Sequence, residues 1–327
     1  RSTSSVVLHF FAVVFAFVGL ELPVAFRALK ADGTGQLVGH ALLVVATVVG
    51  VRFLWLFTVP YIVRLVDRRE AQRERRVGWR ERIVTALNER RVVMAFEPVV
   101  LAGSRDAAFY ECLVRMRQED GQLLLAPDIV PVAEKLGLIR LVDHRVLELV
   151  VAELAASPNI QLSLNISPGT TMDPDWWASV ESMMRANPGA AERLIVEITE
   201  TVAIQDLDDV RGFVTRVKDF GGRIAIDDFG AGYTSFRNLR KLGVDIVKID
   251  GAFVQNLARS ADDRAFVQTL IDLSRRLGIK TVAEWVQDGE SEALLRDWGC
   301  DYIQGRLIGL ASPQRPWLPP DVSSVPA

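Results

Sequence analysis

The sequence is poor in the residues that soft metals and nucleophilic hydrolases use, with two cysteines and three histidines among 327 residues. Cys112 and Cys300 are too few for a disulfide framework, and neither belongs to a CxxC pair, which favours a reducing compartment. His9, His40 and His144 are far apart in the sequence. Their scatter argues against a His-rich zinc site and against a Ser-His-Asp or Cys-His triad.

A large excess of one charge is also missing. The chain has 38 Lys and Arg against 41 Asp and Glu, a net charge of −3, which argues against a protein that binds polymeric nucleic acid through its net charge. We therefore expect no nucleic-acid polymer among its partners. At roughly 150 residues per domain, the length leaves room for about two structural units, of which at least one has a sizeable core.

Charged residues are nearly absent from two segments close to the N-terminus. Residues 6–26 contain only Glu21, and residues 37–63 contain only Arg52. A helix needs about 20 apolar residues to cross a membrane, and neither run shows the polar face of a surface helix. The sequence thus predicts two transmembrane helices, in preference to two buried helices of a soluble domain or a cleaved signal peptide. Because the chain starts at Arg1, we expect a fragment or a processed product.

The next segment is rich in arginine. Residues 64–91 hold ten arginines and five acidic residues. Under the positive-inside rule this segment, and everything after it, lies in the cytoplasm. A solvated charged helix has the same composition, but the position beside an apolar run favours a membrane protein. The predicted localisation is the inner (cytoplasmic) membrane, with the C-terminal domain in the cytoplasm.

From about residue 90, short β-branched runs alternate with longer helical stretches. The candidate strands are Val92–Val100, Ala108–Met116, Ile160–Asn165, Leu194–Ile198, Arg223–Asp227, Asp245–Ile249, Lys280–Ala283 and Tyr302–Gln304. Such alternation is typical of a (β/α)8 barrel. The link between the first two strands, residues 101–107, is too short for a crossover helix, so this pair should be antiparallel. The predicted fold class is α/β, an irregular (β/α)8 TIM-like barrel preceded by two transmembrane helices.

This pattern divides the chain into four parts. They are a two-helix membrane segment over residues 1–66, a basic juxtamembrane linker over 67–83, the barrel domain over 84–311 and a C-terminal tail over 312–327. The tail contains five prolines, which predicts disorder.

Polar residues stand in or at the ends of the predicted strands, where a barrel of this kind gathers its reactive groups. They are Glu111, Asn165, Glu197, Asp227, Asp228, Lys248, Glu284 and Gln304. Any one of them alone is more typical of a surface carboxylate or half of an ion pair. Their recurrence at successive strand ends favours a common site.

The chemistry of this set points to hard divalent cations. Converging buried carboxylates raise one another's pKa unless cations neutralise them. Oxygen ligands from Glu, Asn and Asp select magnesium, manganese or calcium over zinc. Asp227 and Asp228 could bridge two metal ions, as in phosphodiester hydrolysis, and Lys248 could orient the attacking water or stabilise charge on the phosphorane.

A glycine-containing loop, Phe229–Ser235 (FGAGYTS), follows the paired aspartates. Glycines alone are more often part of a turn than of a phosphate site. Beside a metal site, however, the segment suits a mobile loop that orders the ligands. Glu200 could hold this loop in place.

The motifs resemble those of a known family. Glu-x-Leu-x-Arg appears as Glu111-Cys112-Leu113-Val114-Arg115, followed in order by LNIS, VEITET, AIDDFGAGYTSF, VKIDGAFV, TVAE and GCDYIQG. From about Val84 to Leu310, the chain resembles the EAL family of cyclic di-GMP phosphodiesterases. The resemblance implies a barrel, opening of cyclic di-GMP to linear pGpG with Mg²⁺ or Mn²⁺ in a two-metal site, and a homodimer.

The same resemblance assigns roles by motif. It implies that the first metal is bound by Glu111, Asn165, Glu197 and Asp227. The second metal and its water would be served by Asp227, Asp228 and Glu284, with Lys248 acting on the nucleophile. Leu113, Arg115 and Gln304 would hold the dinucleotide, and Glu200 would support the loop. The catalytic residues implied are therefore Lys248, Asp228 and Glu284.

The first 85 or so residues weakly resemble a late part of bacterial sodium/proton antiporters. Two helices of a carrier that has many cannot form a translocation path. We therefore expect this part to act as a membrane anchor or sensor rather than as a transporter.

Three of the positions at which the barrel sequence departs from the family pattern bear on its function. Glu97 replaces the usual glutamine before Pro98, and in the usual AEGVET motif Trp285 replaces glycine and Gln287 replaces glutamate. Loss of a carboxylate can weaken metal binding or water activation, so the roles of Glu97 and Gln287 stay open. Trp285 either stacks on a guanine or fills the barrel rim.

Two functions remain. The leading hypothesis is a membrane-anchored, metal-dependent cyclic di-GMP phosphodiesterase, because the set from Glu111 to Glu284 is complete. The alternative, motivated by Glu97 and Gln287, is an EAL domain of weak or no activity that acts as a cyclic di-GMP receptor.

Overall fold

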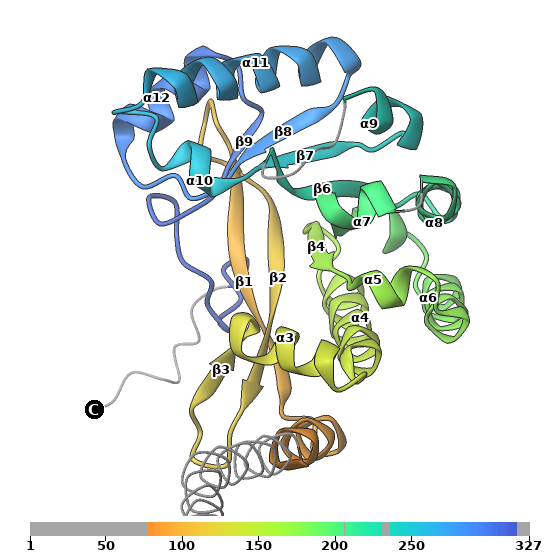
Figure 1. The fold of residues 1–327 in the computed structure, drawn as a ribbon. Helices are drawn as coiled ribbons and strands as arrows, with labels where there is room; N and C mark the ends of the chain where they lie inside the picture. The colour runs from red at the N-terminus through yellow and green to blue at the C-terminus, as the bar shows by residue number, and fades with distance from the viewer. Residues whose placement is uncertain (1–76, 206, 231–235, 319–327) are drawn as a thin grey trace, which may run out of the picture. The chain divides into compact units, whose positions relative to one another are not determined.

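A computed structural model describes residues 77–205, 207–230 and 236–318 (Figure 1). The chain divides into two compact units between Gly78 and Trp79, and nearly all described residues belong to the second. The two predicted transmembrane helices and most of the basic linker lie outside the described residues. Within the described ranges, no helix is both long and apolar enough to span a bilayer.

Eight strands close into a mixed barrel in the order β1-β9-β8-β7-β6-β5-β4-β2, with β2 pairing back onto β1. They are β1 Val92–Leu101, β2 Ala107–Arg117, β4 Leu162–Asn165, β5 Leu194–Thr199, β6 Arg223–Phe229, β7 Ile246–Ile249, β8 Lys280–Ala283 and β9 Tyr302–Ile303. β1 runs antiparallel to both its neighbours, and the other pairs are parallel. The predicted barrel and its antiparallel first pair are thus confirmed.

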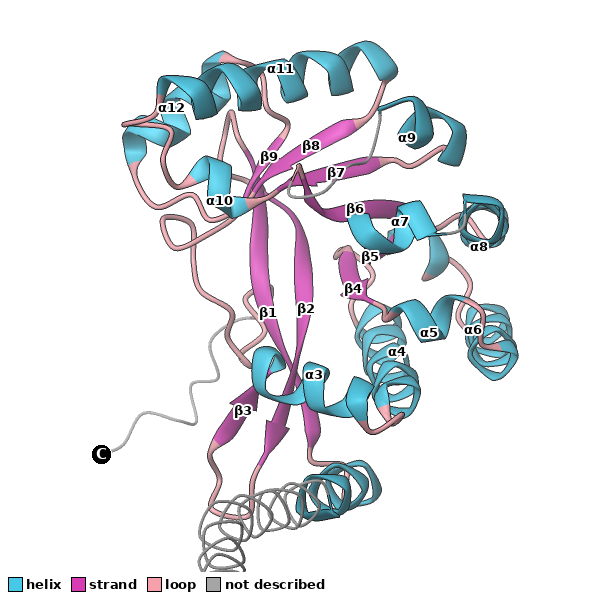
Figure 2. Cartoon of the chain, viewed as in Figure 1, coloured by secondary structure: helices cyan, strands magenta, loops and turns pink. Residues whose placement is uncertain are grey.

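A ninth strand lies outside the ring and was not predicted. β3, Leu123–Leu125, pairs with the end of β2 at Arg115–Arg117. It widens the long β1–β2 hairpin where that hairpin extends past β4, as Figure 2 shows. This extension brings the end of β2 next to the helix that follows β3.

Helices connect the parallel strands and cover the barrel. They are α3 Ala126–Lys135, α4 Ile139–Ala156, α5 Pro168–Thr171, α6 Pro174–Ala186, α7 Glu200–Gln205, α8 Leu207–Asp219, α9 Phe236–Leu242, α10 Gly251–Val254, α11 Ala261–Leu277 and α12 Gly289–Asp297, with a 3₁₀ turn, η1, at Ala191–Arg193. Residues 77–88 are also helical and precede β1.

The ends of α11 show how the sequence sets a helix. The Ser260 side chain accepts a hydrogen bond from the backbone of Asp263, and Gly278 ends the helix with φ of 73°. Acidic residues occupy the first turn and Arg275 and Arg276 the last, which suits the helix dipole. A serine N-cap and a glycine in the left-handed region are among the commonest helix boundaries.

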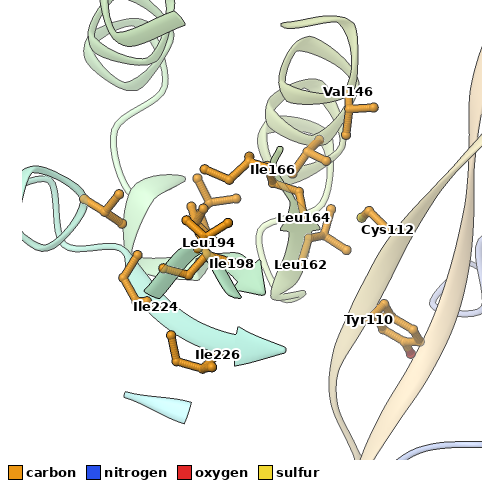
Figure 3. Packing of buried hydrophobic residues seen from close by; sticks show 14 of the residues in the cluster. Tyr110, Cys112, Val146, Leu162, Leu164, Ile166, Leu194, Ile198, Ile224 and Ile226 are labelled. Carbon is orange, nitrogen blue, oxygen red and sulfur yellow. The ribbon is translucent and has the colours of Figure 1, made fainter. Parts of the chain in front are cut away.

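The barrel wall separates two apolar regions because side chains alternate across each strand. On the outer side, Leu162 and Leu164 of β4 join Leu194 and Ile198 of β5 in a core that includes Val146 of α4 (Figure 3). Parallel strands covered by helices are buried on both faces, which explains the continuous apolar runs in the sequence.

Inside the barrel lies a smaller cluster, which we call the apolar layer. Six strands contribute one buried residue each, namely Val99, Phe109, Ile195, Ala225, Ile246 and Val282. Such layers fill the interior of a (β/α)8 barrel and leave no pore. The apolar layer therefore forms a floor beneath the residues that follow it along the strands.

The prediction of disorder from residue 312 is wrong for 312–318, while 319–327 lie outside the described residues. Ser312 forms a β-bridge with Phe96. The Trp317 ring packs at 4.8 Å from the Phe96 ring and 4.9 Å from the Tyr110 ring, between centroids. The burial of one large aromatic side chain thus offsets the entropy of ordering a proline-rich segment.

Candidate active site

A second layer of side chains lies on the apolar layer inside the barrel, and we call it the polar layer. Residues two apart on a strand face the same side, so Glu111 follows Phe109 and Glu197 follows Ile195. The polar layer comprises Glu97, Glu111, Asn165, Glu197, Asp227, Lys248, Glu284 and Gln304. Seven of these eight are residues that the sequence predicts for the site, and the barrel brings them together.

Lys248 lies at the centre of the polar layer and is 1% exposed. Its Nζ is 2.7 Å from Glu197 Oε2, 2.9 Å from Asp227 Oδ1, 2.9 Å from Glu284 Oε1 and 3.1 Å from Glu111 Oε2. Burial alone would lower the pKa of Lys248, yet the four carboxylates raise it well above its usual value. One ammonium group therefore serves as the common counter-ion of four acids.

Glu111 is held by amide groups as well as by Lys248. Asn165 Nδ2 donates to Glu111 Oε1 over 2.8 Å, and Gln304 Nε2 donates to Oε2 over 2.8 Å. Burial would raise the pKa of Glu111, but the charge of Lys248 and the donated hydrogen bonds hold it below its usual value. These contacts fix the orientation of one carboxylate at the floor of the site.

The remaining acids are less well compensated by Lys248. Burial, followed by the negative charge of Glu111, raises the pKa of Glu197 to about 8. Burial also raises the pKa of Glu284 well above its usual value, although Lys248 opposes this shift. Four acids thus share a single cation, which leaves room for further positive charge inside the barrel.

Divalent cations fit this arrangement. Carboxylate oxygens of Asp227, Asp228 and Glu284 lie within 4.8 Å of one another. Among the described residues, no hydrogen-bond donor reaches the buried Oε1 of Glu197. All the candidate metal ligands are oxygen atoms, which magnesium and manganese prefer. An added cation would also relieve the raised pKa values, because a nearby opposite charge favours the ionised form.

Asp228 lies at the rim of the polar layer, where the loop after β6 begins. It is the most exposed of the three clustered acids, and its φ is 55°, a left-handed value that is rare outside glycine. Partial burial, together with the charge of Asp227, raises its pKa. Two residues on, the Gly230 N–H donates to Glu200 Oε2 over 2.9 Å, so Glu200 contacts the backbone just after Phe229.

A groove opens from the polar layer beside β2. It has a volume of about 460 Å³ and runs between β2, α3, α4 and the turn after β4. Glu111, Asp227 and Asp228 line one end, and Leu113 lines the wall together with residues of α3 such as Pro127. Of the residues predicted to hold a dinucleotide, Leu113 thus lies in the groove and Gln304 in the polar layer.

Arg115 and Gln287 lie apart from the contacts around Lys248. The Arg115 guanidinium donates to the Val114 carbonyl over 2.9 Å. Glu97 pairs directly with Glu111 across the β1–β2 ladder, and burial together with the Glu111 charge raises its pKa. Glu97 therefore adds an acid to the polar layer, whereas Gln287 is exposed.

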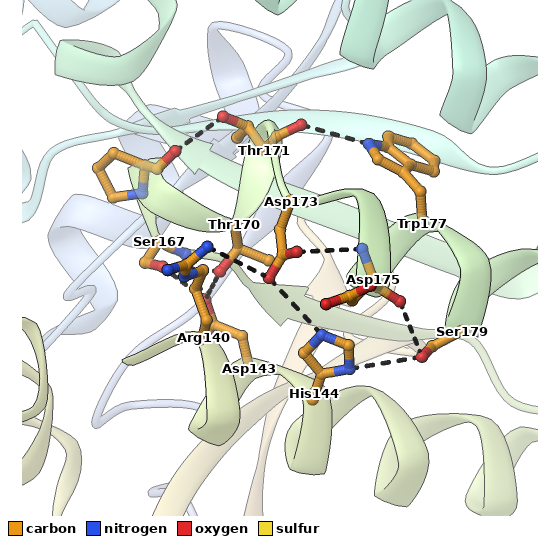
Figure 4. A network of polar contacts seen from close by, with 11 residues as sticks. Arg140, Asp143, His144, Ser167, Thr170, Thr171, Asp173, Asp175, Trp177 and Ser179 are labelled. Carbon is orange, nitrogen blue, oxygen red and sulfur yellow. Dashed lines mark hydrogen bonds and ion pairs between the residues drawn. The ribbon is translucent and has the colours of Figure 1, made fainter. Parts of the chain in front are cut away.

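Asp143 positions the segment after Asn165 and is absent from the predicted site. The buried carboxylate of Asp143 accepts from Ser167 N at 3.0 Å, Ser167 Oγ at 2.6 Å and Thr170 Oγ1 at 2.6 Å, in the network of Figure 4. Burial raises its pKa even so. The available signal was an acidic residue within the apolar face of α4, beside Val142 and Val146.

The described barrel lies in a part of the chain that is similar to known proteins. The family model described as EAL domain matches residues 80–311. The chain is 30% identical over 242 residues to "Cyclic di-GMP phosphodiesterase PdeF" of Escherichia coli, covering 73% of this chain and 32% of that protein. It is 33% identical over 242 residues to "Cyclic di-GMP phosphodiesterase PdeB" of Shewanella oneidensis, covering 72% and 28%. The chain thus spans about a third of the length of these relatives.

Solved structures resemble the barrel as well. The structure "PaMucR Phosphodiesterase, c-di-GMP complex" matches with a TM-score of 0.68 and 29% identity, covering 72% of this chain and 98% of that one. The FimX EAL domain from Pseudomonas aeruginosa bound to c-di-GMP shares the fold, with a TM-score of 0.68, 24% identity and coverage of 72% and 97%. The motifs, the barrel and these matches agree that the chain belongs to the EAL domain family.

Proposed function

We propose that the chain hydrolyses cyclic di-GMP to linear pGpG with the help of Mg²⁺ or Mn²⁺ bound at the polar layer. The observation that carries this proposal is the convergence of Glu111, Glu197, Asp227 and Glu284 on Lys248. Convergent acids in the polar layer suit a cationic cofactor and an anionic substrate. The names of the relatives PdeF and PdeB support the choice of substrate.

The residues in and beside the polar layer would have different roles. Glu111, Asn165, Glu197 and Asp227 would hold one cation, and Asp227, Asp228 and Glu284 a second. When bound, the cations supply Lewis-acid activation of water and charge stabilisation on the phosphate. Lys248 would keep the acids in place and orient the water, which adds to phosphorus as the P–O3′ bond breaks and the 3′-oxygen leaves with a proton.

The groove beside β2 provides the binding surface that such a substrate needs. One end of the groove is acidic, whereas its wall at Leu113 and α3 is apolar. A flat base can lie against the apolar wall while the phosphates face the cations. Arg115 and Gln304 would add hydrogen bonds near the same end.

We also propose that the protein is anchored in the inner membrane with the barrel in the cytoplasm and works as a homodimer. The support for anchoring is the pair of nearly uncharged runs, 6–26 and 37–63, followed by the basic segment 64–91. Membership of the EAL family supports the dimer.

Product analysis tests the proposed activity. The purified full chain is incubated with cyclic di-GMP and Mg²⁺ or Mn²⁺, and the nucleotides are separated by chromatography. We expect pGpG that disappears with a chelator. Glu111→Ala should reduce its formation by at least about 100-fold, because one substitution removes a ligand and the acceptor of two amide groups. The matched control is Glu119→Ala, an exposed acid in the turn after the same strand.

A receptor that binds cyclic di-GMP without hydrolysing it is the second candidate. Glu97 favours it, because this departure from the family pattern lies directly opposite Glu111 and can disturb cation binding and water activation while the ligand is still bound elsewhere in the groove. Intact substrate under saturating metal, together with saturable binding in a parallel titration, would establish the receptor and reject the enzyme.

A further inference from the structure

Trp285 occupies an unusual position directly after Glu284, at the mouth of the barrel. Its side chain is 57% exposed, and its φ is 54°. The left-handed region is costly for a bulky residue, and such strain persists where the surroundings impose it, often at functional sites. A glycine would adopt this backbone without strain, so folding alone does not explain a tryptophan here.

Hydrogen bonds on both sides of Trp285 hold its backbone in place. The Glu284 N–H donates to the Ile249 carbonyl over 3.3 Å, and the Val286 N–H donates to the Gln304 carbonyl over 2.9 Å. The Val286 carbonyl in turn accepts from the Leu307 N–H over 3.0 Å. The segment is thus tied to β7 and to the chain after β9, which fixes the direction in which the Trp285 side chain leaves the backbone.

The indole ring is held as well. A Cβ atom at Gly251 would collide with Cγ and Cδ2 of the Trp285 ring. Gly251 therefore lets the ring lie against the first residue of α10, and the rest of its surface faces solvent. The result is an exposed aromatic surface whose orientation is set before any ligand arrives.

Trp285 and the groove lie on opposite sides of the polar layer. Trp285 follows β8, which lies four strands from β4 in either direction around the ring. The groove beside β2 and β4 and the indole thus flank the polar layer on opposite sides. A cyclic dinucleotide has two bases, and a base on each side would leave its phosphates over the acids between them.

We propose that Trp285 is a stacking platform for a purine base of the substrate, on the side of the polar layer opposite the groove. This inference rests on the proposed function and specifies how the same site binds its ligand. A base stacks on an aromatic side chain through its π-face. A preformed platform binds with little loss of side-chain entropy.

The test compares Trp285→Gly with Trp285→Phe in the full chain. Trp285→Gly removes the ring and relieves the left-handed backbone, whereas Trp285→Phe keeps a ring in the same backbone. We expect Trp285→Gly to raise KM for cyclic di-GMP at least about tenfold, equivalent to about 1.4 kcal/mol, with kcat within about twofold of wild type. Trp285→Phe should stay within about threefold in KM.

Thermal unfolding separates stacking from a structural role. Because glycine suits this backbone, Trp285→Gly should unfold at a temperature no lower than wild type. A KM within about twofold of wild type in Trp285→Gly, or a rise in KM matched by Trp285→Phe, would overturn the proposal.

Equilibrium binding of cyclic di-GMP to the same variants distinguishes this inference from the proposed function. If wild type binds cyclic di-GMP but does not hydrolyse it, weaker binding by Trp285→Gly but not by Trp285→Phe supports the platform. Equal binding by wild type and Trp285→Gly overturns it. If wild type neither binds nor hydrolyses cyclic di-GMP, the proposed function and the platform both fail.

Discussion

The apolar layer and the polar layer are neighbours inside one barrel, built from the same strands two residues apart. Ile195 and Ile246 lie in the first, and Glu197 and Lys248 lie in the second. All four are buried, yet only the first pair gains free energy from burial, because a buried charge costs free energy unless it is compensated. The apolar layer thus stabilises the fold. The polar layer instead holds buried charged groups at the candidate site, at a cost in stability.

The largest effect should come from removing the single cation of the polar layer. Lys248→Met leaves four carboxylates uncompensated, so without metal we expect the free energy of unfolding to fall by about 3–5 kcal/mol. Mn²⁺ should recover part of this loss, because it can take over the neutralisation. Urea unfolding with and without chelator measures both values.

Lys218→Met is the matched control for this substitution. Lys218 is partly exposed and forms an ion pair with Asp245 at 2.8 Å. An exposed pair contributes only about 0–1 kcal/mol, and metal should not alter its loss. Equal losses in the two variants would contradict the idea that Lys248 is the counter-ion of the polar layer.

A substitution in the apolar layer should act on stability rather than on turnover. Ile195 is fully buried, and Ile195→Ala should lower the free energy of unfolding by about 2–5 kcal/mol. In the folded protein, kcat should remain within about threefold of wild type, because no polar contact of the site is removed. A severe loss of kcat at unchanged stability would show that the apolar layer also contributes to turnover, and would contradict the division between the two layers.

The rim of the polar layer should show an intermediate effect. Glu200→Ala removes the acceptor of the Gly230 N–H, so kcat should fall by about 10- to 100-fold as the loop loses its support. Glu200→Gln keeps an acceptor of the same length and should retain most activity. Steady-state kinetics measure kcat for both variants. Equal losses of kcat in the two would instead indicate that the charge of Glu200 is required.

The smallest effect should come from Gln287→Glu, which restores the acid that the family motif usually has. Gln287 is exposed, so we expect activity within about twofold of wild type and little change in stability. Strong activation by this substitution would show that the missing carboxylate limits turnover, and would favour the receptor as the role of the natural chain.

Strand alternation is the reason that the sequence predicts most of the barrel and its site. Each buried strand carries a polar residue near its end, and parallel strands bring these ends to one edge. Glu111 and Lys248 could therefore be placed in one site although they lie on different strands. The antiparallel first pair followed from the short link at 101–107.

Features that depend on register or on distant contacts were not predictable. Glu97 joins the polar layer only through its register opposite Glu111, which a strand pattern does not give. Asp143 acts through contacts with Ser167 and Thr170 that a helix pattern does not show. β3 has three residues, too few for a periodic signal, and Trp317 orders a segment whose composition indicates disorder.

Binding of Mn²⁺ tests the central claim, that the polar layer is a divalent-cation site, most directly. Electron paramagnetic resonance of free Mn²⁺ in a titration gives the affinity for wild type, Ile195→Ala and Glu111→Ala. We expect equal binding by wild type and Ile195→Ala, and binding at least about tenfold weaker in Glu111→Ala. No binding by wild type, or unchanged binding by Glu111→Ala, would contradict it.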